Sequence, residues 1–190
     1  MNVKHWLRRS ALGILAMSGL AIAGSTAIAQ TTTEGLTIFG GVDSEFRLSY
    51  QIDNNKRRST RARYYLWVAG RKIPREVLEL QISYPEEFEE NGGYFTNASI
   101  ELRDGTGRRG TTIPIEEFVV NSEENIIEIY PEEPIPPNSS FTIVLSDVRN
   151  PNRYGNHFFV LDVMYQGGVL RQLVGIWPIE AAAQNQTDID

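Results

Sequence analysis

The sequence predicts an all-β protein, an antiparallel immunoglobulin-like β-sandwich that follows a cleaved N-terminal signal peptide. Apolar and polar side chains alternate over many short segments, which is the period of a half-buried strand. Turn-forming residues separate these segments, and the only helical candidate is a single turn at residues 85–88. Short strands without intervening helices are typical of a sandwich or a barrel. The polar face of several strands favours the sandwich.

Residues 1–29 have the pattern of a secretory signal peptide. Lys4, Arg8 and Arg9 supply a positively charged start, and an uncharged apolar run follows them. The run ends at Ala27-Ile28-Ala29, a small-residue cleavage site. The arginine pair also permits twin-arginine export as an alternative to ordinary secretion. A membrane-spanning helix takes about 20 apolar residues, more than this run has, so we expect no transmembrane segment in the mature chain.

The mature chain is predicted to form one β-sandwich domain at residues 30–180, followed by a flexible acidic tail at residues 181–190. The clearest alternation lies at residues 46–52, whose four apolar side chains would face the core. Further strands are predicted at residues 64–69, 78–82, 100–103, 117–120, 126–130, 141–145, 159–165 and 170–176. Gly167 and Gly168 lie between the last two of these and favour a hairpin.

Composition excludes several kinds of chemistry. The chain has no cysteine and two histidines, of which only His157 lies beyond the signal peptide. Thiolate nucleophiles, zinc-thiolate sites, iron–sulfur clusters and multi-histidine metal sites are therefore not available. Removal of residues 1–29 takes three of the 18 basic residues and none of the 24 acidic ones, which leaves a net charge of −9. So acidic a chain is poorly suited to nucleic acid. We predict no catalytic, cofactor or metal residues.

A basic and aromatic segment is the sharpest charge feature. Its residues are Lys56, Arg57, Arg58, Arg61, Arg63, Tyr65 and Trp67. Arginine side chains suit phosphate, sulfate or carboxylate groups, so the segment is a candidate site for an anion or a protein partner. The alternative is a solvated hairpin tip whose charges are balanced by nearby acidic residues. Alternation places Tyr65 and Trp67 on the face of their strand opposite to Tyr64.

Two further positions bear on catalysis. Glutamates occur as adjacent pairs, but adjacent residues of a strand point to opposite faces and do not form the facing carboxylates of a glycosidase. His157 and Asp162 also fall on opposite faces of one strand, so they form no part of a triad. We expect His157 to be a strand-end histidine partnered by backbone or water. Asp162, if buried, needs a partner such as an arginine.

The last third of the chain carries a pattern of prolines, glycines and aromatic residues. It includes Pro134-Ile135-Pro136-Pro137, Val148-Arg149-Asn150-Pro151, the aromatic segment 157–165, Gly167-Gly168 and Gly175 before Trp177-Pro178. Together with Tyr64-Tyr65-Leu66 and residues 77–82, this pattern resembles the cyanobacterial family of small exported proteins known as domain of unknown function 2808. The resemblance implies an exported β-sandwich of unknown activity, and it brings no catalytic or ligand residues.

These observations predict an exported, non-enzymatic binding or structural module of the cell envelope, in the periplasm or outside the cell. Its expected partner is an envelope protein or an anionic polymer. The alternative is a carboxylate-dependent hydrolase that acts on envelope glycans or esters. That alternative requires a concave pocket lined by two carboxylates.

Overall fold

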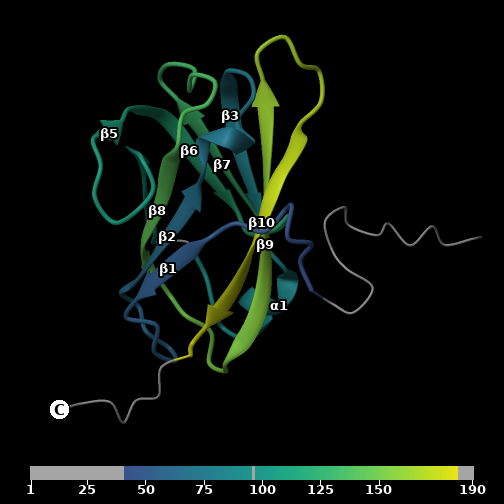
Figure 1. The fold of residues 1–190 in the computed structure, drawn as a ribbon. Coiled ribbons are helices and arrows are strands. Elements are labelled where there is room, and N and C mark those ends of the chain that lie inside the picture. The colour runs from purple at the N-terminus through teal and green to yellow at the C-terminus, as the bar shows by residue number, and fades with distance from the viewer. Residues whose placement is uncertain (1–40, 96, 184–190) are drawn as a thin grey trace, which may run out of the picture. The chain divides into compact units, whose positions relative to one another are not determined.

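In a computed structural model of the protein, the structure describes residues 41–95 and 97–183. They form an antiparallel immunoglobulin-like β-sandwich of two five-stranded sheets (Figure 1). The predicted fold class is therefore confirmed, whereas the predicted signal peptide and residues 184–190 lie outside the described residues. No helix in the described ranges is long and apolar enough to cross a membrane.

The two sheets take strands from distant parts of the chain. The first sheet has the order β1 (Tyr50–Asp53), β2 (Ala62–Val68), β8 (Phe141–Val148), β4 (Ser99–Asp104) and β5 (Thr112–Ile113). The second has the order β10 (Gln172–Ala181), β9 (Gly155–Tyr165), β3 (Val77–Ser83), β7 (Ile126–Pro131) and β6 (Ile115–Asn121). The short helices are η1 (Gly70–Lys72) and α1 (Glu86–Glu90). Because consecutive strands such as β2 and β3, or β7 and β8, lie in different sheets, the chain crosses between sheets, as in Greek-key sandwiches.

The core lies between the sheets and comes from one face of each strand. In the first sheet Tyr64 and Leu66 of β2 are completely buried, as are Ile143 and Leu145 of β8. In the second sheet the buried residues of β9 alternate with half-buried ones from His157 to Tyr165. The expected separation of Tyr64 from Tyr65 and Trp67 is present, because the former belongs to the core cluster and the latter two do not.

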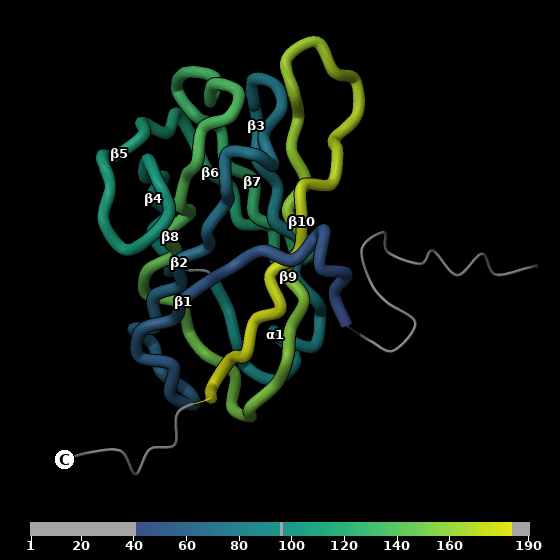
Figure 2. Tube along the Cα trace, in the orientation of Figure 1, coloured from purple at the N-terminus to yellow at the C-terminus, as the bar shows by residue number. Residues whose placement is uncertain are grey.

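The segment before β1 differs from the prediction. Only Tyr50–Asp53 joins the first sheet, whereas Arg47 forms a parallel bridge with Ile176 of β10. The Leu48 amide donates to the Ile176 carbonyl at 2.9 Å. Figure 2 shows this segment passing from β1 to β10. A Cβ at Gly175 would lie 2.5 Å from the Phe46 carbonyl oxygen, so the crossing requires glycine there.

His157 does not have the polar partner that its strand-end position suggested. It is 2% exposed, and neither ring nitrogen has a hydrogen-bond partner in the described ranges. Its ring lies edge-on to Phe88 of α1, with 5.2 Å between centroids. The expected backbone partner is therefore not found among the described residues, and the ring packs against the aromatic side chain of α1 at the end of β9.

Asp162 lies on the outer face of the second sheet, opposite to His157 as predicted. It is half-buried, and this burial raises the pKa of its carboxyl group. The nearby Arg171 acts in the opposite direction and lowers that pKa. Arg171 itself forms ion pairs with Glu79 of β3 and Glu128 of β7, so the charged residues of this face are linked to one another.

Candidate functional site

The basic loop, residues 54–61 between β1 and β2, is held by two buried asparagines. Asn150 is completely buried, and its Nδ2 donates to the Lys56 carbonyl at 3.0 Å. Its Oδ1 accepts from the Tyr64 hydroxyl at 2.7 Å. Asn55 donates through Nδ2 to the Glu180 carbonyl at 2.8 Å. Its side-chain oxygen accepts from Ala182 at 2.7 Å, so the ordered chain continues past the end of β10.

Three cationic side chains of the basic loop remain available. Lys56, Arg57 and Arg61 make no side-chain hydrogen bond or ion pair with another described residue, and the two arginines are exposed. Arg58 instead donates through Nε to Asn152 Oδ1 at 3.1 Å. A hollow of about 460 Å³ opens between these loop residues. Of the five predicted cations, Lys56, Arg57 and Arg61 therefore remain without a side-chain partner among the described residues, on a loop that buried asparagines support.

Arg63 and Tyr65 lie on the outer face of the first sheet. Arg63 donates through Nε to Ser146 Oγ of β8 at 2.8 Å. The guanidinium of Arg108 lies 5.4 Å from the Tyr65 ring centroid and forms an ion pair with Asp53. A side-chain hydrogen bond with Tyr65 is the main cause that raises the pKa of both arginines. Since Tyr65 is only 4% exposed, it positions cations and does not offer a free aromatic surface.

Trp67 lines a second, smaller hollow on the same sheet face. The cationic hollow has a volume of about 190 Å³, and three cations line it: Arg47, Arg71 and Lys72. No acidic side chain is among its lining residues, whereas Ser49 and Thr106 supply hydroxyl groups. Sequence reasoning missed these three cations. Arg47 comes near Trp67 only in the folded chain, whereas Arg71 and Lys72 follow Trp67 closely and could have been found from the sequence.

Alternate residues of β2 connect the two parts of the site. Arg63, Tyr65 and Trp67 share one face of β2, and such residues follow one another at about 6.6 Å. Thr106 and Arg108, both from the β4–β5 loop, reach this row. We call the basic loop, this row with Arg108, and the cationic hollow together the basic face.

Charge is segregated between the two sheets. In the first sheet with loops 54–61 and 105–111, eight basic residues accompany four acidic ones. The basic residues are Lys56, Arg57, Arg58, Arg61, Arg63, Arg103, Arg108 and Arg109, and the acidic ones are Asp53, Glu101, Asp104 and Asp147. The strands of the second sheet with turn 122–125 and loop 166–171 hold eight acidic residues and one basic residue, Arg171, which pairs with Glu79 and Glu128. The acidic residues are Glu79, Glu116, Glu117, Glu123, Glu124, Glu128, Asp162 and Glu180.

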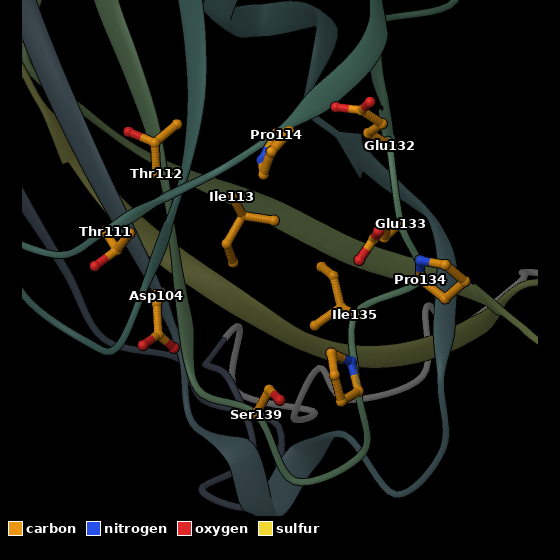
Figure 3. Close-up of a pocket in the computed structure, with 11 residues that line it drawn as sticks. Asp104, Thr111, Thr112, Ile113, Pro114, Glu132, Glu133, Pro134, Ile135 and Ser139 are labelled. Atoms are coloured by element: carbon orange, nitrogen blue, oxygen red, sulfur yellow. The ribbon is translucent and has the colours of Figure 1, made fainter.

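A groove of about 650 Å³ lies at the end of the sandwich where β5 leads into β6 and β7 leads into β8 (Figure 3). Ile113 and Ile135 line this acidic groove together with Pro114, Pro134 and Pro136. Its charged residues are Asp104, Glu132 and Glu133, all of them exposed, and no basic residue lines it.

The acidic groove does not have the arrangement expected of a glycosidase. Figure 3 shows the carboxylates of Glu132 and Glu133 pointing apart. Their exposure also differs from the desolvated carboxyl that serves such enzymes as general acid. No group of three or more histidine, cysteine or carboxylate side chains in the described ranges is arranged to hold a metal ion.

The arrangement of the strands makes this chain an immunoglobulin-like β-sandwich. Residues 36–180 match the family described as a protein of unknown function (DUF2808). The chain belongs to this family, as its sequence pattern predicted. Comparison with curated proteins gives no match.

Two solved structures from bacterial surface proteins are similar in fold. The collagen-binding domain from a Staphylococcus aureus adhesin is 14% identical, with a TM-score of 0.39, and the match covers 72% of this chain and 96% of that one. The collagen binding subdomain of the Enterococcus faecalis surface protein ACE is 10% identical, with a TM-score of 0.43, covering 73% and 98%. At these identities the likeness concerns the strand arrangement alone.

Proposed function

We propose that the protein is an exported, non-enzymatic binding module of the cell envelope whose basic face docks an anionic partner. The observation that carries this proposal is the segregation of charge, in which an acidic chain concentrates its unpaired cations on one sheet. A field of one sign over one face attracts oppositely charged ligands and orients them. A purely solubilising distribution would give the two sheets a similar ratio of basic to acidic residues.

An anionic polymer suits the shape of the basic face. The row of Arg63, Tyr65 and Trp67 extends from the basic loop to the cationic hollow. A linear polymer with repeated carboxylate or sulfate groups can contact several of these cations at once, and each added contact strengthens the others through effective concentration. The hydroxyls of Ser49 and Thr106 add neutral hydrogen-bond partners at one end.

The proposal of export rests on residues 1–29, whose basic start, apolar run and Ala27-Ile28-Ala29 site are those of a signal peptide. The cell envelope contains both anionic polymers and proteins as partners, so the final location is the periplasm or the outside of the cell. The absence of cysteine from the chain is compatible with an oxidising compartment.

Binding to two soluble polyanions, dextran sulfate and poly-L-glutamate, tests the proposal. Calorimetric titration of the exported chain is compared with that of an Arg57→Ser, Arg61→Ser variant. We expect the variant to bind about fivefold to thirtyfold more weakly, since each exposed ion pair contributes up to about 1 kcal/mol. Binding of the unaltered chain should weaken as salt increases, because exposed charges are screened.

A matched control carries Arg75→Ser and Arg171→Ser. It loses the same number of charges, but Arg75 lies beside Tyr165 and Arg171 pairs with Glu79, away from the basic face. We expect its affinity to equal that of the unaltered chain. Equal weakening in both variants would mean that net charge alone governs binding, and no binding by the unaltered chain would overturn the proposal.

A further inference from the structure

The acidic groove presents charges that the protein itself leaves unpaired. Asp104, Glu132 and Glu133 make no side-chain hydrogen bond or ion pair within residues 41–95 and 97–183. Between these charges lie the half-buried Ile113 and the exposed prolines Pro114, Pro134 and Pro136, whereas Ile135 is buried (Figure 3). A ligand that matches this groove therefore combines positive charge with apolar parts, as the stems and head groups of arginine and lysine do.

The basic loop, at the opposite end of the sandwich from the groove, has side chains of this kind. Phe141, the first residue of β8, pairs with Asp104 beside the groove. The other end of β8 leads to Asn150, which holds the basic loop through Lys56. The eight residues of β8 separate the two features by about 26 Å at the usual rise of a strand. Figure 1 likewise shows the β1–β2 loop and the β5 end of the sandwich at opposite ends.

Both surfaces are fixed before any contact forms. Three prolines restrict the backbone that lines the groove, and the buried amides of Asn55 and Asn150 hold the basic loop. Surfaces that are already ordered lose less conformational entropy when they associate. The available cations of Lys56, Arg57 and Arg61 can therefore meet the groove carboxylates without first ordering a flexible segment.

We infer that the basic loop of one copy docks into the acidic groove of a second copy. The inference rests on the proposed function, because it uses the same loop as the docking element and names a partner for it. The contact is heterologous, since different surfaces of the two copies meet. Because loop and groove lie at opposite ends, each added copy leaves one loop and one groove free, and the copies assemble head to tail in a row.

Sedimentation velocity of the exported chain tests this inference. We expect species larger than one copy at about 20 mM salt and one copy at about 500 mM, because the charges that meet are exposed and screened. Glu132→Gln with Glu133→Gln should abolish association by removing groove charge. Arg57→Ser with Arg61→Ser should abolish it by removing loop charge. Circular dichroism checks that both variants keep the sheet fold.

Mixing the two variants is the decisive experiment. The loop of the groove variant is intact, and so is the groove of the loop variant. Their mixture should form a dimer of one copy each and nothing larger, because the remaining loop and groove are neutralised. A mixture that stays monomeric, or an unaltered chain that is monomeric at both salt concentrations, would overturn the inference.

Polyanion binding separates this inference from the proposed function. The groove variant should bind dextran sulfate as the unaltered chain does, since its basic face is unchanged. If the unaltered chain binds dextran sulfate but never self-associates, the proposed function stands and the inference fails. If it self-associates through the loop but binds no polyanion, the partner of the basic face is a second copy and not an anionic polymer.

Discussion

At the scale of single residues, buried polar side chains hold the basic loop and make the stability of the protein depend on pH. Asn55 and Asn150 have buried side-chain amides. Their hydrogen bonds join the basic loop to the turn between β8 and β9 and to the chain after β10. Along the sequence both asparagines look like ordinary turn residues. Their role could not be predicted, because each partner lies about a hundred residues away and only the folded chain brings them together.

His157 makes stability depend on pH. Its burial lowers its pKa, because the charged ring would be desolvated, and Glu87 only partly opposes this effect. In the unfolded chain the histidine has a pKa of about 6.5, so the unfolded chain takes up the proton first as the pH falls. The stability associated with neutral His157 is therefore complete above that pH and is lost as the pH falls toward the folded-state pKa. The slope is at most about 1.4 kcal/mol per pH unit.

The variant His157→Leu should lack this part of the pH dependence. Urea unfolding at several pH values between about 5 and 8 gives the free energy of unfolding for both chains, in the window where histidine titrates. We expect the difference between variant and unaltered chain to grow in favour of the variant as pH falls. Carboxylates change the stability of both chains alike, so parallel curves would show that His157 does not titrate in this window.

At the scale of elements, local alternation indicates where strands form, whereas the tertiary structure decides which strands pair. The strands predicted at residues 78–82, 126–130 and 141–145 lie within β3, β7 and β8. Residues 46–52 have a continuous alternation, yet the chain leaves the first sheet before Tyr50 to pair with β10. Alternation indicates which side chains are buried, but it carries no information about which strand is the neighbour.

A buried hydroxyl helps to hold the β4–β5 loop, together with backbone hydrogen bonds such as that from the Gly105 amide to the Ser140 carbonyl. Thr142 of β8 donates to the Gly105 carbonyl at 2.8 Å and accepts from the Gly107 amide at 3.3 Å. Thr142→Val should destabilise the protein by about 1–2 kcal/mol, since these groups lose a partner. Hydrogen exchange of residues 105–111 should become faster as the loop detaches from Tyr65.

Thr112→Val is the matched control for this change. Thr112 of β5 is exposed and its substitution removes the same hydroxyl from a residue of the same type. We expect its unfolding free energy to stay within about 0.5 kcal/mol of the unaltered chain, as for other surface changes. Unaltered exchange of the loop in Thr142→Val would show that other contacts hold it, such as that between Arg103 and the Arg108 carbonyl.

At the scale of the whole molecule, the proposed export would change the net charge of the protein. The proposed signal peptide carries three basic residues, so its removal would make the remaining chain more acidic and leave the basic face as its main positive region. We predict that the exported protein begins at Gln30. Intact mass measurement of the protein recovered from the cell envelope or medium should give the mass of residues 30–190. A protein recovered with Met1 in the cytoplasm would contradict export.

By itself, the sequence determined the β-sandwich class, the strand segments, the family and the position of the basic loop, because alternation, turn residues and charge runs are local. Only the tertiary structure decided which side chains share a surface. It brought Arg47 to Trp67, placed Arg108 over Tyr65, and set the acidic groove at the end opposite to the loop. Strand pairing joins residues that are distant along the chain, and the energy of that pairing comes from the complete core, which no local segment contains.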